Sequence, residues 1–205
     1  MYESADKYVK LLNRMFIKEF TMAKNKLPKF DELHTIHSAS AMYQRMYSYV
    51  KEYFLKIAID SYREGLELLD SPLSAKKSDV PDRKWVSDFF VGYDKLTAYV
   101  FEHEVDRKAS RFAESVIATD YMAKMYDTAL RLWANQVAQY AINITDMALL
   151  KAYLDNGVKK IKWVTTLDDR TCKVCEARNG NIYPINKIPL KPHIGCRCYY
   201  LPVED

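Results

Sequence analysis

Glycine and long apolar runs are what this sequence lacks most clearly. Only 5 of its 205 residues are glycine, and neither G-x-G-x-x-G nor G-x-x-x-x-G-K-[ST] occurs. A dinucleotide-binding fold or a P-loop nucleotide site is therefore not expected. No apolar run approaches the roughly 18 residues that a bilayer-spanning helix needs, and the polar segment from Met1 to Lys7 is unlike a signal peptide. The sequence predicts a protein that is made in the cytoplasm and has no membrane segment.

Positive charge is concentrated in the last quarter of the chain. Residues 1–150 carry 21 basic and 21 acidic side chains, whereas residues 151–205 carry 10 basic and 6 acidic ones, which accounts for the whole net charge of +4. The same stretch holds all four cysteines, three of the five glycines and four of the seven prolines. A charge of +4 does not by itself predict DNA binding. The composition divides the chain into a long body and a short, turn-rich tail.

The first part of the body has the apolar periodicity of helices. Apolar side chains between Tyr8 and Phe20 recur at the spacing of one helix face, and the helix should end at Leu27-Pro28, because a residue before proline disfavours the helical conformation. A second pattern runs from Asp31 to about Leu69. One helix of that length would be about 55 Å long at 1.5 Å per residue. The alternatives are a break near Ser38-Ala39-Ser40 or a protruding rod that lies along another subunit.

Further helices are predicted after a proline-bracketed loop. Residues 70–81 are polar and include two prolines, which indicates a loop, and an aromatic-rich segment follows over residues 82–91. Residues 94–155 contain neither proline nor glycine, and their apolar residues recur at helical spacing. Two or three helices are expected there, the last of them capped by Asn156-Gly157.

The tail changes to a strand pattern. Residues 162–166, 181–185 and 198–201 are rich in β-branched and aromatic side chains, and turn sequences follow the first of them at 168–171 and precede the second at 179–181. So small a segment has too little apolar surface to fold without a further cross-link. We therefore predict an α+β fold: a mainly helical N-terminal body and a small C-terminal β-rich domain stapled by Cys and His residues.

Four cysteines and one histidine form the clearest chemical motif. The pair Cys172-x-x-Cys175 is followed about twenty residues later by His193-x-x-Cys196-x-Cys198. A C-x-x-C pair lets two thiolates reach one ion, and a second cluster at this distance can complete a tetrahedral zinc site. Thiols in the cytoplasm stay reduced, which favours a metal over a disulfide. The candidate ligands of a structural zinc ion are Cys172, Cys175, His193, Cys196 and Cys198.

Five donors compete for the four places of such a site. The second half is either Cys196 with Cys198 or His193 with one of them. The spacing His193-x-x-Cys196 repeats the chelating pattern of the C-x-x-C pair, but the sequence does not decide between the two sets. Without a metal, the alternatives are a disulfide in an assembled extracellular particle or free buried thiols. A catalytic zinc would need an open coordination position and a general base, and because surface turns normally carry acids such as Asp168 and Asp169, no catalytic residue is predicted.

The tail resembles the C-terminal domain of the phage Mu F-like minor head proteins. That family has G-V-x-K-x-x-W, then D-x-R-T-C-x-x-C, then G-x-x-Y/F, and finally P-x-H-P-x-C-R-C. The residues on this pattern are Trp163, Asp168, Arg170, Cys172, Cys175, Gly180, His193, Cys196, Arg197 and Cys198. The resemblance covers roughly residues 95–203. It departs at Gln139-Tyr140-Ala141, where the family often has Arg-Thr-Glu, and at Ile194, which replaces the usual proline.

The resemblance implies a head morphogenesis protein of a tailed phage or prophage. Members of the family associate with the portal vertex and are implicated in assembly or in DNA packaging and delivery. The expected partners are the portal protein and, as further candidates, the major capsid or scaffolding protein. The expected location is the inside of the capsid near the portal, after synthesis in the bacterial host cytoplasm. The expected divisions are a helical region with a long helix or hairpin at 1–92, the helical part of the Mu F-like domain at 93–157, and its Cys/His-containing part at 158–205.

Other functional classes stand beside this structural, non-enzymatic one. The mildly basic tail suits non-specific contact with packaged double-stranded DNA, whose phosphates attract basic side chains. The candidates for that contact are Lys159, Lys160, Lys162, Arg170 and Arg197. The alternatives to a head protein are a small zinc-containing nucleic-acid-binding module, which would need a more basic surface, and a nuclease-related effector, because domains of this family are sometimes fused to such enzymes. Binding to a portal protein, salt-sensitive DNA binding and metal-dependent cleavage distinguish the three.

Overall fold

The computed structural model describes residues 2–26, 31–69, 105–118, 122–166, 168–169, 171–193 and 195–203. The predicted helix end at Leu27-Pro28, the predicted loop at 70–81 and the segment 82–91 lie outside these residues, as do Arg170 and Ile194. The chain divides into two compact units. We call the described parts of Met1–Asp6, Lys56–Asp82 and Ala138–Asp205 the cysteine unit, and those of Lys7–Leu55 and Arg83–Val137 the helical unit.

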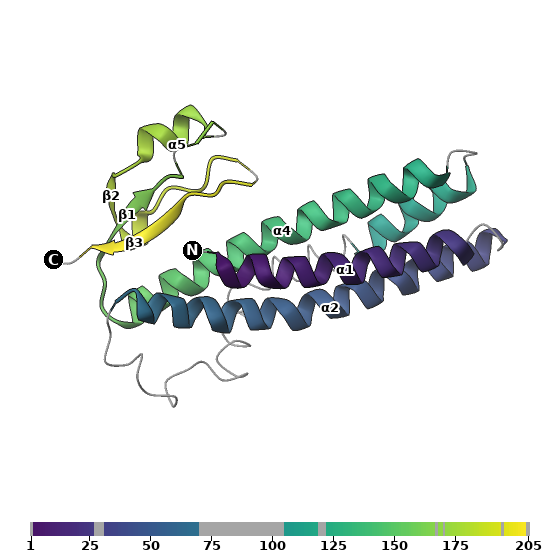
Figure 1. Ribbon diagram of the computed structural model, residues 1–205, viewed down its shortest axis with the longest axis horizontal. Helices are drawn as coiled ribbons and strands as arrows, with labels where there is room; N and C mark the ends of the chain where they lie inside the picture. Colours follow the sequence, from purple (N-terminus) through teal and green to yellow (C-terminus); the bar gives the residue numbers. More distant parts are fainter. Residues whose placement is uncertain are drawn as a thin grey trace. The chain divides into compact units, whose positions relative to one another are not determined.

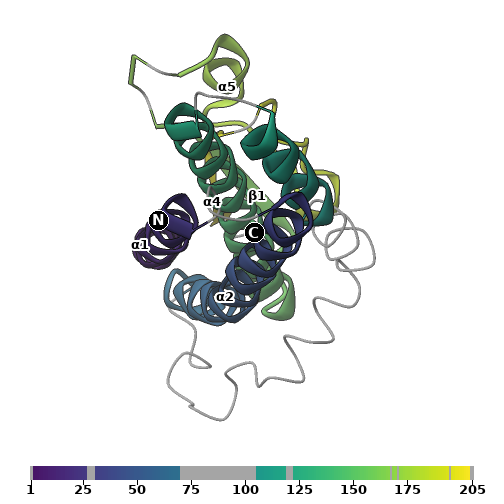
Figure 2. The same cartoon turned by 90° about the vertical axis from the view of Figure 1, so that its right-hand side faces the viewer.

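The helical unit is built around an aromatic core. Most of helix α1 (Glu3–Lys26) and of helix α2 (Glu32–Glu67) belongs to this unit, and these parts lie side by side in Figures 1 and 2. The helical residues 105–117 and the first part of helix α4 (Met122–Asp155) complete the unit. The rings in its core are those of Phe16, Phe20, Tyr43, Phe112, Tyr126 and Trp133. Neighbouring rings meet edge to face, as aromatic pairs prefer. The helical body that the periodicity predicted is confirmed for the described residues.

Helix α2 is continuous over its 36 residues. It passes through Ser38-Ala39-Ser40 without a break, and Ala39 there is fully buried. The next buried side chains, Met42, Tyr43 and Met46, follow at helical spacing and give the helix one continuous apolar face. Packing of that face stabilises the helical conformation across Ser38 and Ser40. The break considered from the sequence therefore does not occur.

Within the cysteine unit, the end of α2 packs closely against α4. A Cβ atom at Gly65 would lie 2.7 Å from the Cβ of Ala152, so the two helix backbones approach where α2 has no side chain. The hydroxyl of Ser61 lies 3.2 Å from that of Thr145 in the same buried contact. Beyond α4, Gly157 has a φ of 78°, the left-handed conformation that commonly follows a helix end. The predicted end of the last helix is therefore confirmed, and the tail starts from a firmly packed helix.

A three-stranded antiparallel sheet in the order β2–β1–β3 forms the tail. Its strands are β1 (Lys160–Val164), β2 (Ile182–Pro184) and β3 (Tyr199–Val203). All three predicted strands exist, with ends shifted by one or two residues. A short helix, α5 (Lys173–Arg178), lies between β1 and β2 in the chain (Figure 1). A turn of 3-10 helix, η4 (Ile185–Lys187), follows β2. Neither helix was predicted.

The sheet has one buried and one exposed face. On β1, Ile161 and Trp163 are buried while Lys160 and Lys162 are exposed, as the two-residue period of a strand requires. The buried face belongs to a small core made of Tyr153, Ile161, Trp163, Cys175, Cys196, Cys198 and Tyr200. Three members of this core are cysteines, so the tail depends on its sulfur atoms for much of its interior.

No helix in the described part of the chain combines the length and the apolar character needed to cross a bilayer.

Candidate metal centre

Two segments of the cysteine unit carry the five sulfur and imidazole donors. The first is the start of α5, where Cys172 is the N-cap and its sulfur accepts a hydrogen bond from the backbone N–H of Cys175 at 3.4 Å. A helical turn brings residues three apart to one face, so α5 aligns these two thiols. The second segment leads into β3. There Gly195 has a φ of 75° and allows the chain to turn between His193 and Cys196.

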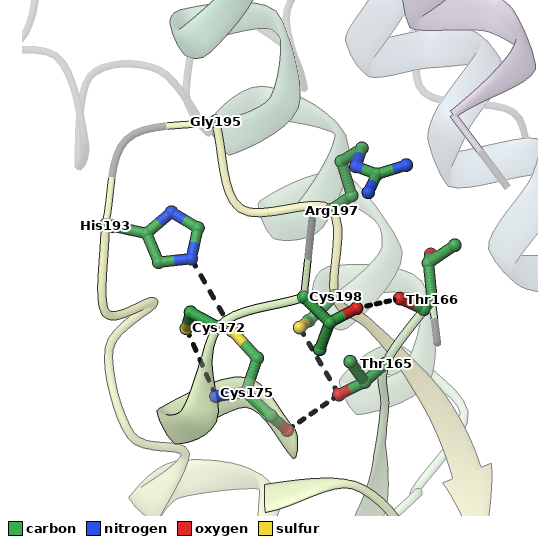
Figure 3. Close-up of a pocket in the computed structure, with 9 residues that line it drawn as sticks. Thr165, Thr166, Cys172, Cys175, His193, Gly195, Arg197 and Cys198 are labelled. Carbon is green, nitrogen blue, oxygen red and sulfur yellow. Dashed lines mark hydrogen bonds between the residues drawn. The ribbon is translucent and has the colours of Figure 1, made fainter. Parts of the chain in front are cut away.

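Cys175 lies in the middle of the donors (Figure 3). Its sulfur is 3.7 Å from Nε2 of His193, and it is also 3.6 Å from the sulfur of Cys196. The donors form two groups of three, and within each group the ligand atoms all lie within 4.8 Å of one another. Cys172, Cys175 and His193 form the first group, and Cys175, Cys196 and Cys198 form the second. Ligand atoms around a tetrahedral zinc ion are about 3.8 Å apart when the zinc–sulfur distance is about 2.3 Å. The five predicted candidates therefore come together, and their cluster could hold a metal.

A small cavity of about 30 Å³ lies inside the cluster. Four of the candidate donors line it, namely Cys172, Cys175, His193 and Cys198 (Figure 3). Cys196 does not line it and is only 1% exposed. A space of this size admits an ion or one or two water molecules.

The four thiols differ in how readily they ionise. The backbone N–H of Cys175 lowers the pKa of Cys172 to about 7. Burial raises the pKa of Cys175 and the pKa of Cys196. Burial also disfavours the charged form of Cys198, but hydrogen bonds from Thr165 and from neighbouring thiols outweigh it, so the pKa of Cys198 is lowered. Because metals bind the thiolate, Cys172 and Cys198 are the two thiols whose surroundings favour the ligand form.

Two side chains of β1 and the turn after it face Cys198. The hydroxyl of Thr165 lies 3.5 Å from the sulfur of Cys198 and 2.9 Å from the carbonyl oxygen of Cys175, so its single proton can turn to either acceptor. The buried indole nitrogen of Trp163 makes no hydrogen bond of good geometry within the described residues, yet it contributes to the lowered pKa of Cys198. A metal-bound thiolate at Cys198 would accept from both donors, which fits the second layer of contacts around a metal site.

Arg197, a candidate for DNA contact, pairs with a carboxylate in this structure. Its Nη2 atom lies 2.7 and 2.6 Å from the two carboxylate oxygens of Asp168, and this hydrogen bonding, together with the charge of Asp168, raises the pKa of Arg197. The backbone N–H of Asp168 in turn donates to the hydroxyl of Thr171. The ion pair therefore joins the loop before β3 to the turn before α5, on the rim of the cavity. Lys160 and Lys162, by contrast, lie on the exposed face of the sheet.

Three residues beside the centre were missed by the sequence analysis. Asp146 of α4 is 7% exposed, and its carboxylate lies 2.5 Å from the ammonium of Lys191 and 2.6 Å from the hydroxyl of Tyr2. Burial raises the pKa of Asp146, and Lys191 opposes that rise. Burial and the charge of Asp146 raise the pKa of Tyr2, so its hydroxyl keeps its proton. An acid within a largely apolar helix segment was a signal for Asp146, whereas nothing in the sequence points to Tyr2.

Comparison with known proteins agrees with the cysteine motif. Residues 105–201 match the family model described as phage Mu protein F like protein. No curated protein and no solved structure matches the chain. The matched residues include all five candidate donors, the whole of α4 and the strands β1 and β2. This match confirms the resemblance predicted from the motif: residues 105–201 are similar to the family described as phage Mu protein F like protein, and that family suggests a role in phage head morphogenesis.

Proposed function

We propose that this chain is a minor head protein of a tailed phage or prophage, which associates with the portal vertex and assists head assembly or DNA packaging and delivery. The family match over residues 105–201 is the observation that supports it. Such a protein acts by binding other head components inside the capsid, so its role is structural rather than enzymatic. The donors that line the small central cavity suit a bound ion, which would stabilise the fold in such a role.

In this proposal the Cys/His cluster is a structural zinc site. We assign the four ligand positions to the donors that line the cavity, which are Cys172, Cys175, His193 and Cys198. Cys196, which is buried and whose pKa is raised, contacts the sulfur of Cys175 but does not line the cavity. A closed set of three thiolates and one imidazole is typical of zinc sites that stabilise a fold. Through one bound ion, these side chains would connect α5 to the loop before β3. The small core of the tail by itself stabilises the position of this loop only weakly.

The ligand assignment is tested by metal content per purified chain. Each of the five donors is replaced in turn, Cys by Ser and His193 by Ala, under reducing conditions. The native chain and Cys196→Ser should each hold about one zinc ion, and the other four variants should lose most of it. Loss in Cys196→Ser together with retention in Cys198→Ser would reverse the assignment of these two residues. Stoichiometric metal in every variant, or no metal in the native chain, would refute the site.

The head-protein function is tested by co-purification with partners of the same phage or prophage. The tagged chain is co-expressed separately with the portal protein, the major capsid protein and the scaffolding protein. Retention of the portal protein, but not of the other two, supports association with the portal vertex. Retention of the capsid or scaffolding protein alone would place the chain elsewhere in the assembly and contradict the portal contact.

Contact with DNA is tested separately. Lys162 is exposed on β1, and a Lys162→Glu variant should weaken a salt-sensitive gel shift if the sheet face meets phosphates. A gel shift without portal binding would support an independent nucleic-acid-binding module instead. Metal-dependent cleavage of DNA or RNA would support a nuclease-related effector and contradict a purely structural role.

A further inference from the structure

The loop that carries His193, Cys196 and Cys198 is held by groups that lie far away in the sequence. Lys191 forms an ion pair with Asp146, and the backbone N–H of Gly195 donates to Gln139. The carbonyl oxygen of Cys198 accepts from the hydroxyl of Tyr2. All of the partners belong to the cysteine unit and come from α4 or from the residue before α1. The loop is thus fixed before, between and at its donors, independently of any metal.

Tyr2 contacts both ends of this loop through one hydroxyl group. Its oxygen accepts a hydrogen bond from the ammonium of Lys191 at 2.7 Å, although the two residues are 189 positions apart. The single hydroxyl proton lies between the carbonyl oxygen of Cys198 at 2.7 Å and the carboxylate of Asp146 at 2.6 Å. Lys191 also lies over the ring of Tyr2, 5.1 Å from its centroid. A buried hydroxyl with three polar contacts links Lys191, Cys198 and α4 at one point.

The backbone of Tyr2 indicates that these contacts hold the residue in place. Its φ is 70°, and it is the one non-glycine residue with positive φ among the described residues. For a residue with a large side chain this conformation is unfavourable and persists only when the surroundings impose it. Tyr2 is nevertheless only 9% exposed, and its hydroxyl makes three polar contacts. These contacts outweigh the strain of its backbone.

The same face of α4 holds the middle of the loop. The side-chain oxygen of Gln139 accepts from the backbone N–H of Gly195, at the turn between His193 and Cys196. The amide nitrogen of Gln139 donates to Asn143 at 3.0 Å, which orients the side chain. Gln139, Asn143 and Asp146 are spaced four and three residues apart and therefore share one helix face. This polar face and Tyr2 together form the anchor of the loop.

We propose that Tyr2 is a positioning residue of the metal centre, whose hydroxyl orders the loop of His193 and Cys198 before metal binds. The inference rests on the proposed zinc site. Its physical basis is preorganisation: a loop that is already ordered loses less conformational freedom when its side chains bind an ion. Contacts one layer outside the ligands typically change metal affinity by about 10- to 100-fold. Removal of the Tyr2 hydroxyl should therefore weaken zinc binding by about 10-fold.

The test is Tyr2→Phe, which removes the hydroxyl and keeps the ring over Lys191. Zinc affinity is measured by competition with a chromophoric chelator. Hydrogen–deuterium exchange of residues 188–198 is measured separately in metal-free, reduced protein. The matched control is Tyr183→Phe, because that hydroxyl lies in the same unit and contacts the side chain of Asn181 rather than the loop. The expected result is about 10-fold weaker zinc binding and faster exchange of the loop in Tyr2→Phe, with both unchanged in the control.

The two measurements separate this inference from the zinc site itself. If the native chain binds no zinc, the site fails, and unchanged exchange of the metal-free loop in Tyr2→Phe would show that the anchor fails as well. If the native chain binds zinc and Tyr2→Phe binds it equally tightly, the positioning role is overturned while the site stands. Equal weakening in Tyr2→Phe and Tyr183→Phe would reveal a general loss of stability and would also overturn it.

Discussion

At the scale of single residues, the four thiols are distinguished by their surroundings. Cys172 is partly exposed at the start of α5 and has a pKa of about 7, whereas Cys175 and Cys196 are buried and their pKa values are raised. The sequence places the four cysteines in two similar-looking pairs and gives no means of ranking them. The ranking comes from burial, from the backbone N–H beside Cys172 and from the hydrogen bonds around Cys198, and only the folded chain supplies these.

This ranking predicts the order of alkylation in metal-free, reduced protein. At pH 7 to 7.5 the thiolate fraction of Cys172 is about one half or more, because its pKa is about 7. Cys172 should therefore react first with iodoacetamide, and the rate should rise as pH increases through 7. Peptide mass spectrometry identifies the modified residue, and Cys172→Ser should lack the fast phase. A fast phase that belongs to Cys196 would contradict the structure.

The ion pair of Asp146 with Lys191 yields a second residue-scale prediction. Both side chains are 10% exposed, and breaking a buried pair leaves an uncompensated charge that costs about 3–5 kcal/mol. Asp146→Ala should lower the free energy of unfolding by that amount, as measured by urea denaturation. The double variant Asp146→Leu with Lys191→Met should lose much less, because no charge stays buried alone. A double variant as unstable as the single one would show that the pair is not the cause.

For helices and strands, the periodicity of the sequence predicted where the elements lie in the chain but not how they contact one another. The helices, their end at Gly157 and the three strands follow from near-neighbour patterns in the sequence. Helix α5 was missed because six residues contain too little periodicity, and a C-x-x-C pair suggests only a turn. The continuity of α2 was left open because the spacing of its apolar residues does not show what packs against Ser38-Ala39-Ser40. In the structure Ala39 is fully buried, so this segment packs against the rest of the unit and the helix continues through it.

The close approach of α2 and α4 gives a prediction at this scale. Gly65→Ala would put a methyl group 2.7 Å from the Cβ of Ala152, and overpacking of this kind costs about 1–3 kcal/mol. This destabilisation should appear in urea denaturation, although alanine is intrinsically the better helix former by about 1 kcal/mol. Adding Ala152→Gly should relieve the clash, so the double variant should lose less than the sum of the single effects. Strictly additive effects would mean that the two residues do not meet.

At the scale of the whole molecule, the two units predict different responses to metal removal. All candidate ligands lie in the cysteine unit, and the aromatic core of the helical unit contains none of them. Chelation of zinc, or Cys175→Ser, should therefore speed proteolysis and hydrogen exchange within residues 158–203. Far-ultraviolet circular dichroism at 222 nm should fall only slightly. Complete loss of helicity would show that the tail is not a separately stabilised part, and unchanged exchange of the tail would show that no metal supports it.

The helical body, the β-rich tail, the candidate donors and the resemblance to the phage Mu protein F like family could all be predicted before folding was considered, because each is encoded in residue types a few positions apart. The folded chain alone shows which donors line the cavity, that Cys196 contacts Cys175, and that Tyr2 and α4 contact the loop. Those contacts join residues as far as 196 positions apart. Such pairings depend on how whole elements pack, and no local spacing in the chain records them.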